Sequence, residues 1–323
     1  MAHLIDMSNS RANMAYVGDT PWHGLGSLLM KGASIEVWQK EAGMNWKAEK
    51  AVVQYQPNHE AAAYFKSEED SVVYRDDTYA RLGLVSSNYK IVQPGEVLSF
   101  FKDLTEKYGY ELDTAGCLKG GRIAWALART GDVVRVRGND IVNGYMLLST
   151  SFDGSMATTA RFTSVRVVCN NTLQMSMADA PVVKVSHRSV FDEVEAKRQL
   201  GVGAFHKFEE QANAMAERIV SVEEQIKFFT SVYHDMTLAE LNDKNKPSVD
   251  KTMARLARIL TTAPGQNIPS AKGTLWGLVN AVTHDVDFSK PSRSQDNRLT
   301  SSWFGDGAVT KAKAWDAALA LVA

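Results

Sequence analysis

Basic residues gather in one stretch of the sequence, between positions 119 and 166. Aromatic residues are interleaved with them, and only three acidic residues, Asp132, Asp140 and Asp153, fall in the same stretch. Proteins that bind single-stranded nucleic acid without sequence preference place cations against the phosphates and aromatic rings against the bases. Each stacked base contributes roughly 1–3 kcal/mol. The pattern therefore predicts a nucleic-acid groove. Its expected members are Lys119, Arg122, Trp125, Arg135, Arg137, Tyr145, Arg161, Phe162 and Arg166.

The same stretch also has a purely structural explanation. Residues 122–127 alternate between apolar and other side chains, which is the period of a half-buried strand. An antiparallel sheet with one solvated face could carry these arginines without any ligand. Arg135 and Arg137 share one face of a strand by parity, whereas Arg161 and Arg166 do so only if a bulge intervenes. The sequence alone leaves both interpretations open.

Two other sets of residues have types that could support catalysis. Cys169 with His187 as its base could form a nucleophilic pair, although an unpaired cysteine at a strand end is usually a small core residue. His234-Asp235 and His284-Asp285-Val286-Asp287 have the residue types of metal ligands. A hydrolytic metal site needs at least three converging ligands, and histidine near a helix end is a common capping arrangement. We therefore expect no catalytic residue and no metal ligand.

Nucleotide-binding motifs are also missing from the sequence. The chain has no GxxxxGK[ST] motif, and Gly120-Gly121 does not open a helix in a βαβ unit. We expect a binding protein that uses no cofactor, rather than an enzyme.

Local patterns predict an α+β fold in which a central antiparallel β-meander positions the basic residues. A helix is expected over 94–108, because Pro94 suits a first turn and Gly109 suits a helix end. Gly131-Asp132 and Asp153-Gly154 predict turns between strands. The strands and short helix expected around them cover residues 34–42 (helix), 48–55, 61–65, 82–86, 122–127, 133–137, 141–150 and 156–169.

The second half of the chain has helical periodicity. Apolar residues recur at alternating spacings of three and four from Phe205 to Tyr233, which predicts one long helix after the sheet. This stripe could face the core or form a subunit contact. Further helices are expected over 249–260, from a Ser270 cap to 286, and over 308–322, with a loop over 287–298. The expected regions are 1–90 (accessory), 91–241 (helix, basic sheet and long helix) and 242–323 (helical).

Overall composition is that of a globular protein with almost no net charge. The 323 residues include 36 Lys and Arg and 37 Asp and Glu, for a formal charge of −1. By segment, the net charge is −5 for 1–113, +5 for 114–188, −5 for 189–241 and +4 for 242–323. This excludes indiscriminate coating of nucleic acid but permits a local basic groove. Two cysteines and no long apolar segment predict a soluble cytoplasmic protein that does not enter membranes.

Several motifs resemble a family of proteins of unknown function from phages, prophages and conjugative plasmids. The most specific is the block from Phe162 to Leu173, which contains Arg166-Val167-Val168-Cys169-Asn170-Asn171-Thr172-Leu173. The others are Trp22-His23-Gly24-Leu25-Gly26, Tyr89-Lys90-Ile91-Val92-Gln93, Gly120-Gly121-Arg122, the block from Thr274 to Thr283, and Ser302-Trp303-Phe304-Gly305. The resemblance implies a role in the biology of mobile DNA.

The order of helix, β-meander and long helix also resembles the core of phage single-strand annealing recombinases of the RecT, Red-beta and Erf kind. That resemblance implies a homo-oligomeric ring or filament that binds single-stranded DNA and promotes annealing and recombination without ATP. An alternative is a host-takeover or anti-defence protein that binds a host or phage protein through the apolar stripe and the acidic segment 189–241. A third, a metal-dependent nuclease or hydrolase, would use the His-Asp pairs.

Overall fold

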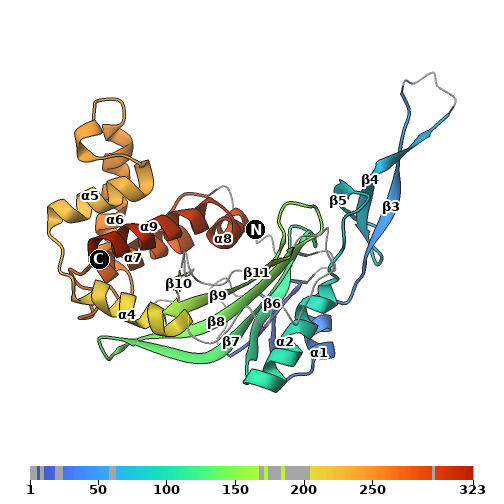
Figure 1. Ribbon diagram of the computed structural model, residues 1–323, viewed down its shortest axis with the longest axis horizontal. Coiled ribbons are helices and arrows are strands. Elements are labelled where there is room, and N and C mark those ends of the chain that lie inside the picture. Colours follow the sequence, from blue (N-terminus) through green and yellow to red (C-terminus); the bar gives the residue numbers. More distant parts are fainter. Residues whose placement is uncertain are drawn as a thin grey trace. The chain divides into compact units, whose positions relative to one another are not determined.

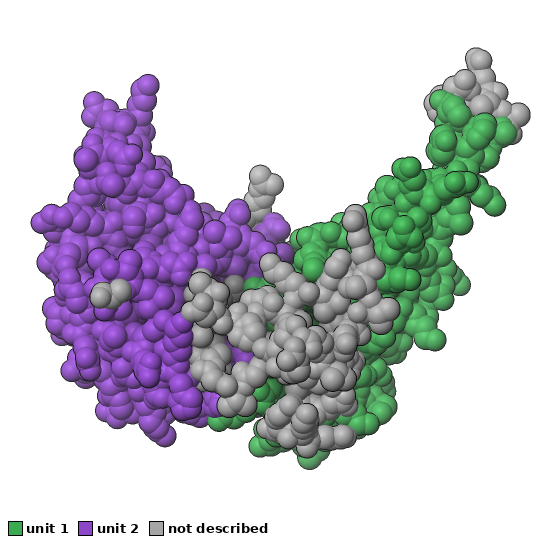
Figure 2. Space-filling view, in the orientation of Figure 1, with its two compact units in different colours: residues 1–131, 146–161, 181–201 green, residues 132–145, 162–180, 202–323 purple. Residues whose placement is uncertain are grey.

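The computed structural model describes residues 6–7, 11–18, 25–57, 63–166, 171–173, 183–185, 204–292 and 295–322 (Figure 1). The chain forms two compact units, each built from separate stretches (Figure 2). Unit 1 comprises residues 1–131, 146–161 and 181–201, and unit 2 comprises 132–145, 162–180 and 202–323. The α+β class with a helical C-terminal half is confirmed. No helix among the described residues has the length and apolar character needed to cross a membrane.

The larger sheet is built around an antiparallel meander, as expected. Its strand order is β10-β9-β8-β7-β6-β1-β2, with β11 also paired to β9 and with β1 and β2 parallel. Its strands are β1 (Met14–Val17), β2 (Ser27–Leu29), β6 (Glu111–Leu118), β7 (Ile123–Val136), β8 (Asp140–Ser151), β9 (Thr158–Arg166), β10 (Asn171–Leu173) and β11 (Val183–Val185). Strands β7, β8 and β9 each contribute residues to both units.

Strand β7 is longer than the sequence analysis predicted. The expected turn at Gly131-Asp132 is wrong, because the chain continues as a strand through both residues to Val136. Gly131 has a φ of +86°, a backbone conformation that glycine adopts without strain, so the strand is irregular there without reversing direction.

The described residues of unit 1 also form a three-stranded antiparallel sheet and two helices. The sheet has the order β3 (Ala48–Tyr55), β4 (Phe65–Arg75), β5 (Arg81–Ser86). Helix α1 (Ile35–Glu41) begins where the Ser34 hydroxyl accepts from the Val37 N–H, and α2 (Pro94–Tyr108) begins at proline. Both helices match the sequence predictions, and α2 packs on β6 while α1 packs on α2 and β1.

The helices of unit 2 pack around a cluster of aromatic rings. Phe208 stacks on Trp315 with ring centroids 5.1 Å apart, and Trp276 meets Phe208 edge-on at 6.3 Å. All three side chains are buried. The elements are α4 (Ala204–Glu217), α5 (Val222–His234), η1 (Leu238–Glu240), α6 (Lys246–Thr262), α7 (Leu275–His284), the π-helical turn η2 (Asp285–Ser289), α8 (Gln295–Phe304) and α9 (Asp306–Val322).

The single long helix predicted over 205–233 is wrong, because α4 and α5 are separate helices. Ser221 starts α5 with a capping box, in which its hydroxyl accepts from the Glu224 N–H and the Glu224 carboxylate accepts from the Ser221 N–H. The residues between the two helices are bonded to the segment before α7, since the Val220 N–H donates to the Gly273 carbonyl. The stripe is therefore divided: Met215 is buried, whereas Ile219 is 60% exposed.

Two further boundaries in the C-terminal half differ from the prediction. Thr274, and not Ser270, caps the helix that follows, because its hydroxyl accepts from the Gly277 N–H. The segment 287–298, predicted as a loop, contains the end of η2 and the start of α8. Ser270 has another role, described below.

Candidate nucleic-acid interface

The three aromatic side chains predicted to stack on bases are buried. Trp125, Tyr145 and Phe162 are 1%, 5% and 4% exposed, respectively. In β7 all six residues from 123 to 128 are buried, so this part of the strand is covered on both faces and does not have the half-solvated character that alternation predicted. A buried ring presents no face to a base. This corrects the expectation that these rings form the stacking platform.

Four predicted cations lie away from the end of β7, Lys119, Arg122 and Arg161 in unit 1 and Arg166 in unit 2, and they differ in their exposure. Arg122 is exposed and Lys119 is half-exposed, on a turn where Lys119 has a left-handed φ of +54°. Arg161 is half-buried, and burial lowers the pKa of its guanidinium. The side chain of Arg166 lies outside the described residues, although its backbone pairs with Asn171. Of this set, Arg122 is the most accessible to an external phosphate.

Arg135 and Arg137, in unit 2, are both exposed and stand at the end of β7. Arg137 directly follows the strand and has a left-handed φ of +45°. One of its guanidinium nitrogens, Nη1, lies 3.4 Å from the carbonyl oxygens of Ala216 and Pro269. A guanidinium has five N–H donors, so this anchoring still leaves donors for a ligand.

The backbone beside these two arginines is held by side chains from α4. Strand β7 lies between β8 and β6, and its pairing with β6 extends only to Arg129. Beyond that residue, the edge of β7 on the β6 side needs other hydrogen-bond partners. The Asn213 amide supplies them: its Oδ1 accepts from the Arg137 N–H at 2.8 Å and its Nδ2 donates to the Arg135 carbonyl at 3.4 Å. Glu209 accepts from the Arg135 N–H at 3.4 Å. Asn213 thus makes the two hydrogen bonds that a neighbouring strand would make.

A buried aspartate fixes the turn that follows Arg137. Asp140 is 1% exposed and accepts from the Ser270 hydroxyl at 2.7 Å and from the Trp276 indole Nε1 at 2.8 Å. Ser270 therefore serves the turn between β7 and β8 and not a helix cap. Asn213 thus holds the backbone at Arg135 and Arg137 directly, and Asp140 holds the turn that follows them.

Helix α6 carries exposed cations that the sequence analysis did not select. Lys251 and Arg258 are exposed, seven residues apart on the helix, and Lys244 is exposed just before it. Among the ion pairs formed by described residues, none includes these three side chains, whereas Lys246 pairs with Asp250 at 2.8 Å. The net charge of +4 over residues 242–323 was the available signal.

The aspartates of the His-Asp motif are paired within unit 2. Asp285 is buried and accepts from Arg255 at 2.6 and 3.1 Å and from the Tyr233 hydroxyl at 2.7 Å. Burial, with the Asp285 charge, raises the pKa of Tyr233 well above its usual value. Within the described parts of the chain, no three potential metal ligands gather at one place. Asp285 acts here as an internal anchor between α5, α6 and η2.

Asp287 belongs to a second buried cluster. The Lys311 ammonium forms an ion pair with Asp287 and lies 2.7 Å from the Ser302 hydroxyl, which itself bonds to Asp287. Burial lowers the pKa of Lys311, although the Asp287 charge opposes that shift. His284, at the end of α7, is half-buried, and its pKa is also lowered mainly by burial. These contacts tie η2, α8 and α9 together.

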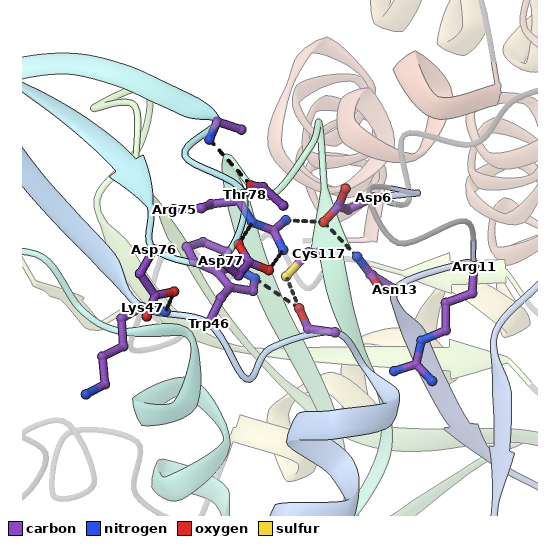
Figure 3. Close-up of polar contacts among 12 residues, drawn as sticks. Asp6, Arg11, Asn13, Trp46, Lys47, Arg75, Asp76, Asp77, Thr78 and Cys117 are labelled. Atoms are coloured by element: carbon purple, nitrogen blue, oxygen red, sulfur yellow. Dashed lines mark hydrogen bonds and ion pairs between the residues drawn. The ribbon is translucent and has the colours of Figure 1, made fainter.

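Unit 1 contains a comparable buried cluster around Arg75 (Figure 3). Arg75 is fully buried, pairs with Asp6 and with Asp77 (2.8 Å), and lies 4.5 Å above the Trp46 ring centroid. Cys117 is close by, and burial raises the pKa of its thiol to about 12. A thiol of this kind is a weak nucleophile, and the cluster fastens the N-terminal segment to β4 and β6. Cys169 and His187, considered earlier as a pair, lie outside the described residues.

Unit 1 contains a pocket of about 750 Å³. Its floor includes Leu29 and Trp38. Charges on its rim pair with one another, Arg129 with Asp113 at 2.8 Å and Lys31 with Glu111 at 3.0 Å. Arg129, the remaining arginine of the basic stretch, is therefore engaged by a carboxylate.

The family model described as Domain of unknown function (DUF932) matches residues 81–303, more than half of the chain. The chain belongs to this family. The DUF932 span extends from β5 into α8, so it includes the Arg135–Arg137 strand end, its Asn213 support and the Asp285 anchor. Strands β3 and β4 and helix α9 lie outside the DUF932 match. No curated protein and no solved structure matches the chain.

Proposed function

We propose that this DUF932 protein binds single-stranded DNA along the phosphate backbone and promotes strand annealing without nucleotide hydrolysis. The expected setting is the cytoplasm of a cell that carries a phage or a plasmid. The observation that carries the proposal is the presentation of Arg135 and Arg137, two exposed cations on backbone held by Asn213 and Asp140. Because the backbone is already ordered, binding a phosphate there loses little backbone entropy.

Burial of the predicted rings changes the expected mode of binding. With Trp125, Tyr145 and Phe162 inside the core, the contacts to DNA fall on arginine and phosphate and not on stacked bases. Phosphate contacts carry no sequence information and release counterions, so affinity should be independent of sequence and fall steeply with salt. Bases left unstacked by the protein stay available to pair with a complementary strand, which is what annealing requires.

Fluorescence anisotropy of a labelled oligothymidine, measured over a salt series, tests the proposal. Each phosphate contact contributes about −0.7 to the log–log salt slope for a single strand. Arg135→Ala/Arg137→Ala should therefore weaken binding and reduce the slope by about 1.4. Lys227→Ala/Lys313→Ala is the matched control, since these exposed lysines already pair with Glu223 and Asp235. It should bind as the wild type does.

A second measurement separates annealing from simple binding. Two complementary oligonucleotides, one quenching the other's fluorophore on pairing, should anneal faster with the wild-type protein in the absence of ATP. Absence of any anisotropy change at low salt would refute the proposal, as would equal binding by the Arg135/Arg137 variant and the wild type. Preference for duplex over single strands would overturn its single-strand component.

A further inference from the structure

The distal halves of β3 and β4 form a ribbon that has no core behind it. We call residues 53–55 and 65–70 the β3–β4 arm; none of these residues is buried, and β4 pairs with β5 only from Asp70 onward. The arm extends beyond β5 in Figure 1. Tyr55 and Phe65 are cross-strand neighbours with ring centroids 6.0 Å apart, and they are 53% and 50% exposed. A two-stranded ribbon is marginally stable alone in water, and exposed apolar side chains grouped together mark interaction surfaces.

The arm also carries an unbalanced negative charge. The β3–β4 register passes from Val52 opposite Ser71 to Gln54 opposite Lys66, so residues 67–70 bulge out of the ladder. Glu68, Glu69 and Asp70 stand on this bulge, all exposed. None of the ion pairs recorded for the described residues includes these three carboxylates. The partner surface should therefore be both apolar and basic.

Unit 2 exposes both kinds of side chain on two helices that pack against each other. The N-terminal part of α5 and the residues before it expose the apolar side chains of Ile219 (60%), Val222 (70%) and Ile226 (37%). These belong to the apolar stripe, and the break at Ser221 leaves them outside the core. Helix α6, which packs against α5, exposes Lys251 and Arg258. A rise of about 1.5 Å per residue places these two cations roughly 10 Å apart along the helix.

We propose that the β3–β4 arm of one molecule docks on the α5–α6 surface of a second copy. Tyr55 and Phe65 would cover the exposed apolar side chains of α5, and the acidic bulge would face the cations of α6. The two surfaces differ, so the contact is head-to-tail: each copy offers one arm and receives another. Repetition of a head-to-tail contact gives a closed ring or a filament. The assembly needs no nucleic acid.

Charge reversal tests the contact, with sedimentation velocity of the full chain over a concentration series as the readout. The wild type should sediment as an oligomer in the absence of DNA. Glu68→Lys/Glu69→Lys and, separately, Lys251→Glu/Arg258→Glu should each raise the dissociation constant by about tenfold or more, because two attractions become repulsions. An equimolar mixture of the two variants should assemble again, and so should the chain that carries all four substitutions.

Two controls make the result specific to these surfaces. Exchange of the exposed Lys31–Glu111 pair, as Lys31→Glu/Glu111→Lys, touches neither surface and should leave assembly unchanged. Tyr55→Ser/Phe65→Ser tests the apolar component and should dissociate the oligomer with unchanged circular dichroism. A wild type that stays monomeric at every concentration overturns the proposal. Reversal variants that assemble normally, or a mixture that stays monomeric, also overturn it; none of these outcomes depends on DNA binding.

Discussion

Lys311 is the most informative position for testing how the helical unit is held together. Its side chain is 1% exposed and that of its ion-pair partner Asp287 is 8% exposed, with Ser302 bonded to both. Lys311→Met keeps most of the side-chain length but removes the charge. Asp287 is then left as a buried carboxylate without the cation that balances its charge.

The magnitude follows from the desolvation of the remaining charge. Removing one partner of a buried ion pair costs about 3–5 kcal/mol, against a total stability of about 5–15 kcal/mol for a typical domain. Lys311→Met/Asp287→Asn removes both charges and keeps a hydrogen-bond acceptor for Ser302. The double variant should therefore lose less stability than the two single variants taken together, by a coupling free energy of about 1–3 kcal/mol.

The stability of the Asp287→Asn variant should depend on pH through Lys311. Burial already lowers the pKa of Lys311 below its usual 10.5, and loss of the aspartate should lower it further. A lysine whose folded pKa lies below the unfolded value loses its proton more readily in the folded state. The stability of this variant should therefore rise with pH up to about pH 10.5.

Urea unfolding of the four proteins, followed by tryptophan fluorescence and circular dichroism, measures these differences. Trp315, one of seven tryptophans in the chain, lies on α9 one turn after Lys311, so part of the fluorescence comes from the affected helix. A Lys311→Met variant within about 1 kcal/mol of the wild type would refute the reasoning. A double variant that loses as much stability as the two single variants taken together would do the same.

Three other predictions concern separate parts of the fold. Asn213→Ala leaves the Arg137 N–H and the Arg135 carbonyl without their amide partner, and should cost about 1–3 kcal/mol and accelerate amide hydrogen exchange at Arg137. Equal exchange in wild type and variant would contradict it. Ser221→Ala removes the α5 cap and should lower the free energy of unfolding by about 1 kcal/mol, measured by thermal denaturation. Because burial raises the pKa of Cys117 from 9.0 to about 12, its contribution to stability is complete below pH 9 and is lost as pH rises from 9 to 12, by about 1.4 kcal/mol per pH unit. Comparison with Cys117→Ala by urea unfolding isolates this slope, and parallel pH profiles would exclude it.

Elements defined by neighbouring residues were predictable from the sequence. Strand β3 has the expected bounds, 48–55, because alternating side chains and flanking turn residues mark a strand locally. Helices α1 and α2 begin at Ile35 and Pro94, within one residue of the predicted starts at 34 and 94. These signals lie within one or two turns of the boundary that they fix, so no knowledge of the tertiary structure is needed.

Elements that depend on what covers them were predicted less well. The apolar spacing from 205 to 233 is periodic throughout, yet the core reaches Met215 and not Ile219. Ser221 and Glu224 form a capping box, and their three-residue spacing in the sequence indicates a helix start at this point. Likewise, β7 continues through Gly131 because a glycine permits an irregular strand as well as a turn.

The candidate site was partly accessible to sequence reasoning. Exposure of Arg135 and Arg137 agrees with the alternation in the second half of β7. Burial of Trp125 does not, because tertiary packing covers both faces of the first half of that strand. Asn213 supports the site from another element, and a hydrogen bond between residues so distant in the chain leaves no local pattern to read.

Support of β7 by Asn213 has a consequence for the chain as it leaves the ribosome. The hydrogen bond from Arg137 to Asn213 joins residues 76 positions apart. At about 5–20 residues per second, synthesis of the intervening segment takes roughly 4–15 s. During that interval the edge of β7 beyond Arg129 lacks its α4 partners and can pair with other nascent strands. Efficient production of this protein should therefore depend on translation speed between the two positions and on chaperones that shield unpaired strands.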